Sequence, residues 1–484
     1  MNSRFLWTAK QLKPTLTKSK HVLTPKASLA EGEHVDLDFG DHYVGRIHFV
    51  FQKEGRHPDS PALLHFIFGE KKWELEEDNS AYHGWIAKSW IQEEWIHIDE
   101  FPAKINLSRR YAFRYCRVEL LGCSQAYRVL LQEATLISET SAPEKIAIVG
   151  ETDQEKAIDR VSLRTLSECM QDVFEDGPKR DHRLWLGDLR LQALVNYQTY
   201  RHNDLVKRCL YLFAGTADKN GVLSASVFTK PKVVGDGASM SDYSLLFIPT
   251  VYDYFKATKD KETLLELLPL MRTQIKLADA QMKGGVFLDP NRLGWCFIDW
   301  SLELKKRCAC TGVYLYALRE LIECERELGY DVKSEEARYQ EVKEAAKKEF
   351  YDEKNGLFFC DGQLSFASNI WMVLGGVLSP VEGKEILLRL EERDDVIRPV
   401  TPYMMHHYLI ALYECGLTGK MRNLMNEYWG KMVQDGADTF YELFDPEHPD
   451  ASPYGSRSVN SYCHAWSCTP SYLLRKYFLH GEQS

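Results

Sequence analysis

The first part of the chain alternates between apolar and polar residues. Runs such as HVDLDF, VGRIHFVF, LLHFIF and RVLLQEATLI lie between Val35 and Ile137, separated by Gly, Asp, Pro and Asn. A period of two places one face of each strand in a core, and the regular turn residues favour antiparallel pairing. The pattern predicts an antiparallel β-sandwich, in which Trp85, Trp90 and Trp95 fill the core or lie between domains.

The pattern changes between Ser138 and Lys156. This segment carries Ser, Thr, Pro and charged residues without a sustained apolar period, which is typical of a connector. Beyond it, apolar residues recur at helical spacing. Helix pairs without a strict sequence repeat are predicted at residues 192–214, 243–280, 315–350, 367–392 and 402–430.

About six such hairpins can close into a ring whose loops converge on one mouth. The predicted fold is therefore multidomain and mainly α, with an (α/α)6 six-hairpin barrel behind the antiparallel β-sandwich. We assign residues 1–32 to an N-terminal extension, residues 33–140 to the sandwich and residues 141–484 to the barrel. At 484 residues the chain exceeds what one hydrophobic core usually serves.

Charge and composition narrow the classes of partner. Lys and Arg total 60 against 70 for Asp and Glu, a formal net charge of -10, and no long basic run could follow a phosphate backbone. No stretch approaches the roughly 20 apolar residues that span a bilayer, and the first residues lack the apolar core of a secretory signal. We expect a cytoplasmic protein without nucleic-acid or membrane partners, and its oligomeric state stays open.

The cysteines do not indicate a disulfide framework or a metal site. All 12 are scattered through a large chain, as in proteins of a reducing compartment. Cys308 and Cys310 have no His or Cys partner at zinc-site spacing. We therefore predict no structural metal and no cofactor.

One segment concentrates charged residues: EDGPKRDHRLWLGD, from Glu175 to Asp188. It combines four carboxyl groups with Arg180, Arg183 and Trp185 near a helix start. A solvated loop and a site for a polar ligand are about equally compatible with such a run.

Two further segments carry candidate chemistry. In DTFYELFDPEHP, aromatic neighbours can desolvate the carboxyl group of Glu442 and shift its pKa, and NSYCHAWSCTP adds His464. GWCFIDW places Asp299 beside Trp300, a pairing typical of sugar sites, although Trp is more often simply buried. Glycoside hydrolysis needs one protonated and one ionised carboxyl group, and Asp181 and Glu442 are the candidates.

The run DGPKRDHRLWLGD resembles the signature of glycoside hydrolase family 78, the α-L-rhamnosidases, which reads Asp-Cys-Pro-x-Arg-Glu-Arg-Leu-Gly-Trp-x-Gly-Asp. Asp181 stands where the family carries its general-acid Glu. YELFD is similar to the family's Trp-Glu-Arg-Trp-Asp and places Glu442 on the general base. SDYSLLFIPTVYDYF resembles a family segment in which an acidic residue, here Asp242, opens a helix. The likeness covers the helical domain, and the sandwich is similar to the family's preceding β-domain.

The resemblance implies an inverting exo-α-L-rhamnosidase that removes terminal rhamnose, or a similar deoxy sugar, from small glycosides or oligosaccharides. Asp181 would protonate the leaving oxygen and Glu442 would activate water. It implies that the sugar is bound by Asp176, Arg180, Trp185, Asp188, Asp242, Asp299, Trp300 and His464.

The sequence departs from the family in three places. The acid is Asp, one methylene shorter than Glu, so the donor must come closer through its backbone or act through a water. Gly177 replaces the family's Cys, and His182-Arg183-Leu184 replaces Arg-Leu-Gly, which makes His182 a second candidate donor. The chain ends soon after HAWSCTPSYLLRKYF, so the C-terminal β-domain common in the family is not expected.

Two alternatives stay open on this evidence. A six-hairpin hydrolase for another sugar, such as a uronide, would need a dedicated cation in its pocket. A non-catalytic sugar-binding protein could keep the fold without the chemistry. Whether Asp181 and Glu442 face one pocket separates this second alternative from an enzyme.

Overall fold

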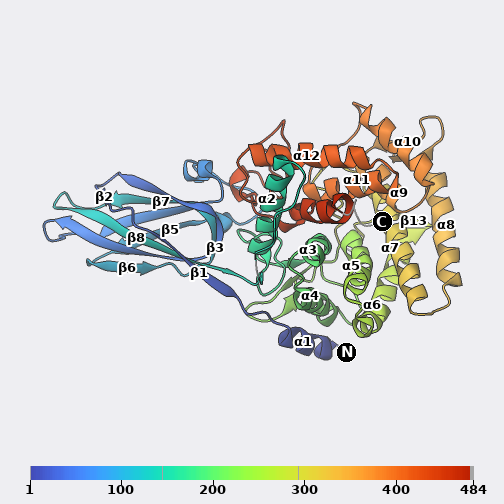
Figure 1. Cartoon of the computed structure of the whole chain (residues 1–484), viewed down its shortest axis with the longest axis horizontal. Helices are drawn as coiled ribbons and strands as arrows, with labels where there is room; N and C mark the ends of the chain where they lie inside the picture. Colours follow the sequence, from blue (N-terminus) through green and yellow to red (C-terminus); the bar gives the residue numbers. More distant parts are fainter. Residues whose placement is uncertain (1, 144, 293, 480–484) are drawn as a thin grey trace.

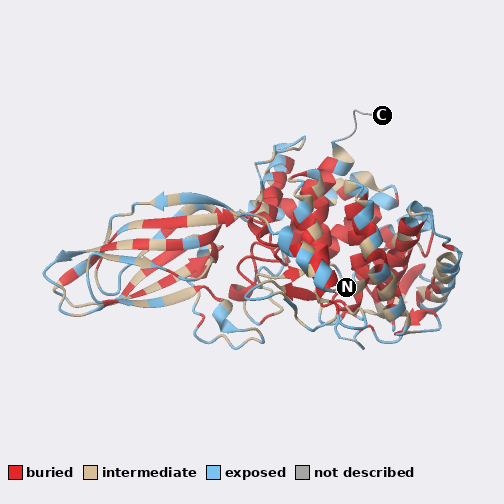
Figure 2. Ribbon diagram, turned by 90° about the horizontal axis from the view of Figure 1, so that it is seen from below, coloured by how far each residue is buried: buried red, intermediate tan, exposed pale blue. Residues whose placement is uncertain are grey.

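The computed structural model describes residues 2–143, 145–292 and 294–479. Figure 1 shows a sheet region at one end of the molecule and a helical region at the other. Buried residues run through both regions and continue into irregular segments at their junction (Figure 2). The prediction of a mainly helical chain with an antiparallel sheet near its N-terminus is confirmed.

The helical region begins after a connector that follows residue 140. Its helices are α2 (Asp153–Cys169), α3 (Leu186–Gln198), α4 (Asn203–Thr216), α5 (Ser241–Thr258), α6 (Lys261–Asp279), α7 (Arg307–Glu327), α8 (Lys333–Phe350), α9 (Phe366–Leu374), α10 (Pro380–Glu391), α11 (Pro402–Glu414), α12 (Thr418–Gln434) and α13 (Pro470–Leu473). Short strands between them are β9 (Leu184–Trp185), β10 (Ser226–Phe228), β11 (Val234–Gly235), β12 (Met282–Lys283), β13 (Val286–Phe287), β14 (Tyr351–Asp352), β15 (Leu357–Cys360) and β16 (Gln363–Leu364). The five predicted helix pairs are confirmed.

The helices pack as an inner and an outer set. α3, α5, α7, α9 and α11 contact one another in chain order, and α13 contacts α3. α6, α8, α10 and α12 each pack on the preceding odd-numbered helix. All of α3 from Leu186 to Asn196 is buried, whereas α8 buries only Val342, Ala346 and Phe350. A helix buried on all sides belongs inside, and one with a single apolar stripe belongs outside.

Local sequence explains several helix starts. The hydroxyl oxygens of Ser365, Ser379 and Thr401 each accept an N–H bond from the third residue beyond, at the starts of α9, α10 and α11. Proline follows directly in α10 and α11, where its missing N–H costs no hydrogen bond. These caps fix where the loops end and the helices begin.

The sheet region is one hydrogen-bonded antiparallel sheet in the order β1-β8-β3-β7-β4-β5, with β2 beside β8 and β6 beside β3. The long strand β3 pairs with β7 through residues 34–45 and with β8 through residues 45–55. Residues of β3, β4, β7 and β8 share one apolar core. The arrangement as a sandwich stays a prediction. The strands are β1 (Thr17–Leu23), β2 (Ala27–Leu29), β3 (His34–Gly55), β4 (Ala62–Gly69), β5 (Glu93–Ile98), β6 (Ala103–Asn106), β7 (Tyr111–Gly122) and β8 (Tyr127–Thr140).

Residues 2–32, which the sequence assigned to an N-terminal extension, take part in both regions. α1 (Asn2–Gln11) packs against α4, where the rings of Phe5 and Tyr211 lie 5.4 Å apart. β1 and β2 pair with β8. The alternation in these two strands is too short and too polar to stand out from the sequence.

Trp85, Trp90 and Trp95 do not fill the core of the sheet region. Trp95 is 56% exposed and stacks on His65 of β4, with ring centroids 4.4 Å apart. Trp85 is 69% exposed, and its indole N–H donates to the carbonyl of Pro453 in the helical region. Trp85 therefore lies between the two regions, which is one of the two placements predicted from the sequence.

No helix in the described part of the chain is both long and apolar enough to cross a membrane.

Candidate active site

A pocket of about 650 Å³ opens where the two regions meet. Eight of the ten predicted site residues line it, and Asp242 and Asp299 do not. The eight are Asp176, Arg180, Asp181, Trp185, Asp188, Trp300, Glu442 and His464.

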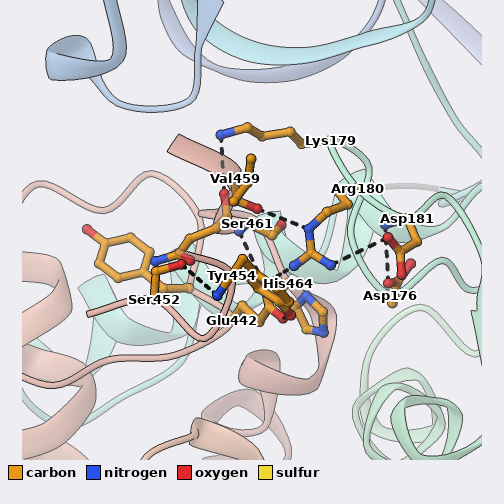
Figure 3. A network of polar contacts seen from close by, with 12 residues as sticks. Asp176, Lys179, Arg180, Asp181, Glu442, Ser452, Tyr454, Val459, Ser461 and His464 are labelled. Atoms are coloured by element: carbon orange, nitrogen blue, oxygen red, sulfur yellow. Dashed lines mark hydrogen bonds and ion pairs between the residues drawn. The ribbon is translucent and has the colours of Figure 1, made fainter. Parts of the chain in front are cut away.

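Arg180 joins the two predicted catalytic carboxyl groups. One terminal nitrogen donates to Glu442, and the other lies 3.4 Å from Oδ1 of Asp181 (Figure 3). Its Nε donates to the carbonyl of Val459 at 3.0 Å, and its guanidinium lies 4.1 Å from the ring centroid of Tyr454. Two carboxyl groups from segments about 260 residues apart thus face one pocket around a fixed cation.

The Glu442 carboxylate is buried and accepts three hydrogen bonds. Besides Arg180, it accepts from the hydroxyl of Tyr454 and from the N–H of Ser461 at 3.3 Å. Burial works to raise its pKa, but the charges of Arg180 and His464 and the hydrogen bonds outweigh burial, so the pKa of Glu442 lies below its ordinary value. Glu442 is therefore ionised at neutral pH, the state that a general base requires.

Asp176 lies beside Asp181, and its pKa is shifted in the opposite direction from that of Glu442. Its two oxygens accept the N–H groups of Arg183 at 3.2 Å and Asp181 at 3.3 Å. Burial and the charge of Asp181 raise the pKa of Asp176 to about 8. A carboxyl group that holds a proton at neutral pH thus lies next to Asp181, across Arg180 from the ionised Glu442 (Figure 3).

His182, the second candidate donor, is unsuited to that role. Burial and the charge of Arg110 lower the pKa of His182 to about 3. The imidazole is therefore neutral at neutral pH. Its ring lies edge-on to that of Trp90, 5.4 Å away, in a packing contact.

Two glycines of the motif allow close approach. A Cβ on Gly177 would lie 2.5 Å from the carbonyl oxygen of Arg180 and 2.7 Å from Oγ of Ser461. A Cβ on Gly187 would lie 2.3 Å from the ring of Tyr243, which lines the pocket. Gly177, which stands where the family has Cys, therefore lets the loop pack tightly against Ser461, whose N–H donates to Glu442.

The most buried end of the pocket offers groups for sugar hydroxyls. Nε2 of His464 lies 3.0 Å from Oδ1 of Asp188. Burial lowers the pKa of His464, but Asp188 and Glu442 outweigh it, so the pKa of His464 is raised. Among the described residues, Nδ1 of His464 and the indole nitrogens of Trp185 and Trp300 have no hydrogen-bond partner.

The carboxylate of Asp242 holds a neighbouring segment of the chain. It lies in the first turn of α5, and its carboxylate accepts the N–H groups of Phe297 at 3.1 Å and Ile298 at 2.8 Å. Ile298 has a φ of 56°, a conformation that is costly for a β-branched residue. Asp242 therefore holds the segment that brings Phe297 to the pocket wall.

The carboxylate of Asp299 likewise accepts hydrogen bonds from other segments of the chain. Its oxygens accept the N–H of Val400 at 2.8 Å and the hydroxyl of Thr401 at 2.7 Å. Thr401 caps α11, so Asp299 ties the loop that carries Trp300 to the start of that helix. The sequence could not separate this role from sugar binding, because a carboxylate beside an indole serves both.

Sequence reasoning missed several residues of the wall. Tyr454, which donates to Glu442, lies in an irregular segment without a recognisable pattern. Trp466 follows His464 by two residues, so its position was a usable signal. Other lining residues that were not predicted are Trp85, Ile86, Ala87, Trp90, Arg183, Met240, Tyr243, Trp295, Phe297, Leu302 and Pro453.

Buried ion pairs attach the catalytic loop to the sheet region. Arg110 donates to both oxygens of Glu175 at 3.0 and 2.6 Å. Lys179 lies 2.5 Å from Glu74 and 3.7 Å from Glu70. These contacts flank Arg180 and Asp181, so the sheet region helps to position the two residues.

Replacing Lys179 with Met is expected to lower the free energy of unfolding by about 3 to 5 kcal/mol, because Glu74 then stays buried without its cation, whereas Glu70 keeps its pair with His42. Urea unfolding measures this change. Lys431→Met is the matched control, since Lys431 forms an exposed pair with Glu427 and its loss should cost about 0.5 kcal/mol or less. Equal losses in both variants would contradict the account.

Within residues 2–143, 145–292 and 294–479, no group of three or more His, Cys, Asp or Glu side chains is arranged to hold a metal ion.

Comparison with known proteins agrees with this geometry. Residues 8–138 match the model of the glycosyl hydrolase family 78 α-rhamnosidase N-terminal domain, and residues 150–478 match that of the bacterial α-L-rhamnosidase 6 hairpin glycosidase domain. Comparison with curated proteins gives no match.

Solved structures give the same assignment. A rhamnosidase from Klebsiella oxytoca with rhamnose bound is 42% identical, with 98% of each chain covered and a TM-score of 0.94. The family 78 rhamnosidase of Bacillus sp. GL1 is 20% identical, and the match covers 93% of this chain and 47% of that one, with a TM-score of 0.77. The α-L-rhamnosidase of Streptomyces avermitilis complexed with L-rhamnose is 15% identical, covers 96% and 44%, and has a TM-score of 0.70. The last two show the fold alone.

Since the six-hairpin model matches more than half of the chain and the Klebsiella oxytoca enzyme is 42% identical over almost all of it, the chain belongs to the α-L-rhamnosidase family and is a glycosidase.

Proposed function

We propose that this protein is an inverting exo-α-L-rhamnosidase that removes terminal rhamnose, or a similar deoxy sugar, from small glycosides or oligosaccharides. The observation that carries the proposal is the position of Asp181 and Glu442 on either side of Arg180 in one pocket. Inverting glycosidases keep their two carboxyl groups about 6.5 to 9.5 Å apart, which leaves room for a water. The rhamnose bound to the Klebsiella oxytoca relative supports the choice of sugar.

In this proposal Glu442 takes a proton from water as the water attacks the anomeric carbon. Asp181 gives a proton to the glycosidic oxygen as that bond breaks. Arg180, Tyr454 and Ser461 hold Glu442 ionised and oriented throughout. The shared pocket favours an enzyme over a non-catalytic binding protein.

The sugar-binding residues of the proposal are Asp176, Arg180, Trp185, Asp188, Trp300 and His464. Arg180 already pairs with Glu442, and much of the wall is aromatic, which favours the methyl group of a deoxy sugar over the carboxylate of a uronide. The direct test is a panel of nitrophenyl glycosides. We expect the α-L-rhamnoside to exceed a fucoside and a glucuronide by about 10²-fold in kcat/KM. A faster glucuronide would overturn the choice of sugar.

We also propose that the inner helices form the ring of an (α/α)6 barrel, closed between α13 and α3, beside a β-sandwich. The inner helices contact one another in the order in which they follow along the chain, which supports this arrangement. A cytoplasmic location is supported by the 12 cysteines, none of which forms a disulfide within the described residues.

Activity should fall above about pH 8 and should persist at acidic pH. Asp176 binds its proton below its raised pKa of about 8 and loses it above that pH, so no proton is then held beside Asp181. Glu442 has a lowered pKa and stays ionised below the ordinary range near 4.3. The profile of kcat/KM against pH measures both limbs.

Asp176→Asn provides the control for this profile, because it removes one of the two coupled carboxyl groups. Whatever its effect on rate, its basic limb should no longer lie near pH 8. An unchanged limb in this variant would assign the titration to another group.

A further inference from the structure

Residues 459–462 lie directly against Glu442. Ser461 bonds to Glu442 through both of its backbone groups: its N–H donates to the carboxylate at 3.3 Å, and its carbonyl oxygen accepts the N–H of Glu442 at 2.9 Å. The carbonyl oxygen of Asn460 accepts from Nζ of Lys179 at 3.2 Å (Figure 3). The segment thus contacts Glu442 on one side and the loop that carries Asp181 on the other.

The carboxylate of Glu70, the residue that follows β4 of the sheet region, bonds to this segment. Its Oε2 accepts the N–H of Tyr462 at 2.7 Å and lies 3.7 Å from Nζ of Lys179. Its Oε1 lies 3.2 Å from Nε2 of His42 in β3. Glu70 is 3% exposed, so these partners replace water around its charge. One buried side chain of the sheet region therefore contacts the loop of Asp181 and the segment against Glu442.

The surroundings of Glu70 keep its carboxylate ionised and in place. Burial works to raise the pKa of Glu70, but the charge of Lys179 and the hydrogen bond to His42 outweigh burial, so this pKa lies below its ordinary value. Turning the carboxylate away would leave a buried charge and a buried N–H without partners, and both changes are costly. Glu70 therefore fixes the position of Tyr462, and with it that of the preceding Ser461.

We propose that Glu70 is a positioning residue, which accepts the N–H of Tyr462 and so holds Ser461 against Glu442 in the place that water activation requires. The inference rests on the proposed function, in which Glu442 is the base, and adds the group of the sheet region that orients this base. General bases tolerate little misplacement, because a shift of about 1 Å can cost about 10²-fold in rate. The sheet region then acts on the base as well as on the loop of the acid.

Two substitutions of Glu70 separate the reach of its side chain from its charge. Glu70→Gln keeps the length, and its amide oxygen can accept from Tyr462 while its NH2 donates to His42. Glu70→Asp keeps the charge but is one methylene shorter. We expect Glu70→Asp to lower kcat for a nitrophenyl α-L-rhamnoside about tenfold, and Glu70→Gln to stay within about twofold of the unmodified protein. KM should change little in both variants, because Lys179, Tyr462 and His42 lie outside the pocket wall.

Glu74→Asp is the matched control. Glu74 is a buried carboxylate that shares Lys179 with Glu70, but its other bond is to the N–H of Lys71 in place of that of Tyr462. This variant should leave kcat unchanged. Unchanged kcat in Glu70→Asp would overturn the inference, and so would a loss of about tenfold in Glu70→Gln or in Glu74→Asp. Full activity of Glu442→Gln would instead count against the base, and absence of hydrolysis by the unmodified protein would count against the rhamnosidase function itself.

Discussion

Asp181→Asn should lower kcat/KM for methyl α-L-rhamnoside by about 10² to 10⁴, the usual contribution of a general acid. The loss should be much smaller for a dinitrophenyl rhamnoside, because a good leaving group departs without a proton. The asparagine keeps the backbone N–H bond to Asp176, so the loop should stay in place. Steady-state kinetics on the two substrates gives the ratio of the losses.

Two further variants sharpen this prediction. Asp181→Glu restores the family's longer acid and should keep substantial activity on both substrates. Asp394→Asn, a charge change on an exposed residue outside the pocket, should change neither rate. Full activity of Asp181→Asn on the poor leaving group, together with loss of activity in His182→Ala, would move the acid to His182.

Glu442→Gln should reduce hydrolysis of both substrates alike, by about 10² to 10⁴, because attack by water is needed whatever the leaving group. The amide oxygen can accept from Arg180, and the amide NH2 can donate to the hydroxyl of Tyr454, so the pocket should keep its shape. Glu427→Gln is the control, since Glu427 only forms an exposed pair with Lys431. Selective loss on the poor leaving group would contradict the role of base.

Much of the site could be predicted because its residues are adjacent in sequence or stand in a family pattern. Asp176, Arg180, Asp181, Trp185 and Asp188 lie in one run, and the structure brings all five to one pocket. Such a run is short enough for local sequence to fix its course, which is why its five residues come together.

The sequence says less about residues whose contacts lie far away along the chain. Asp242 and Asp299 look like ligands for a sugar, yet their oxygens are used by N–H and hydroxyl groups of other segments. Trp85 reaches the pocket only because the connection between β4 and β5 lies against the helical region. Residue type and spacing carry no information about such pairings, so the sequence could not place these side chains.

The same limit explains why the contacts of the N-terminal residues could not be predicted from the sequence. α1 is a short helix whose partner, α4, lies about 200 residues away in sequence, and β1 pairs with β8 at the far end of the sheet region. Neither pairing is visible in a local window. The alternation of β3 and β4, in contrast, repeats over enough residues to indicate strands directly.

The stereochemistry of the first product tests the central claim most directly. Hydrolysis of an aryl α-L-rhamnoside can be followed by proton NMR in the first minutes, before the free sugar equilibrates. An inverting reaction in which Glu442 activates water must release β-L-rhamnose first. Release of α-L-rhamnose first would require a covalent intermediate and would contradict the assignment of Glu442 as base.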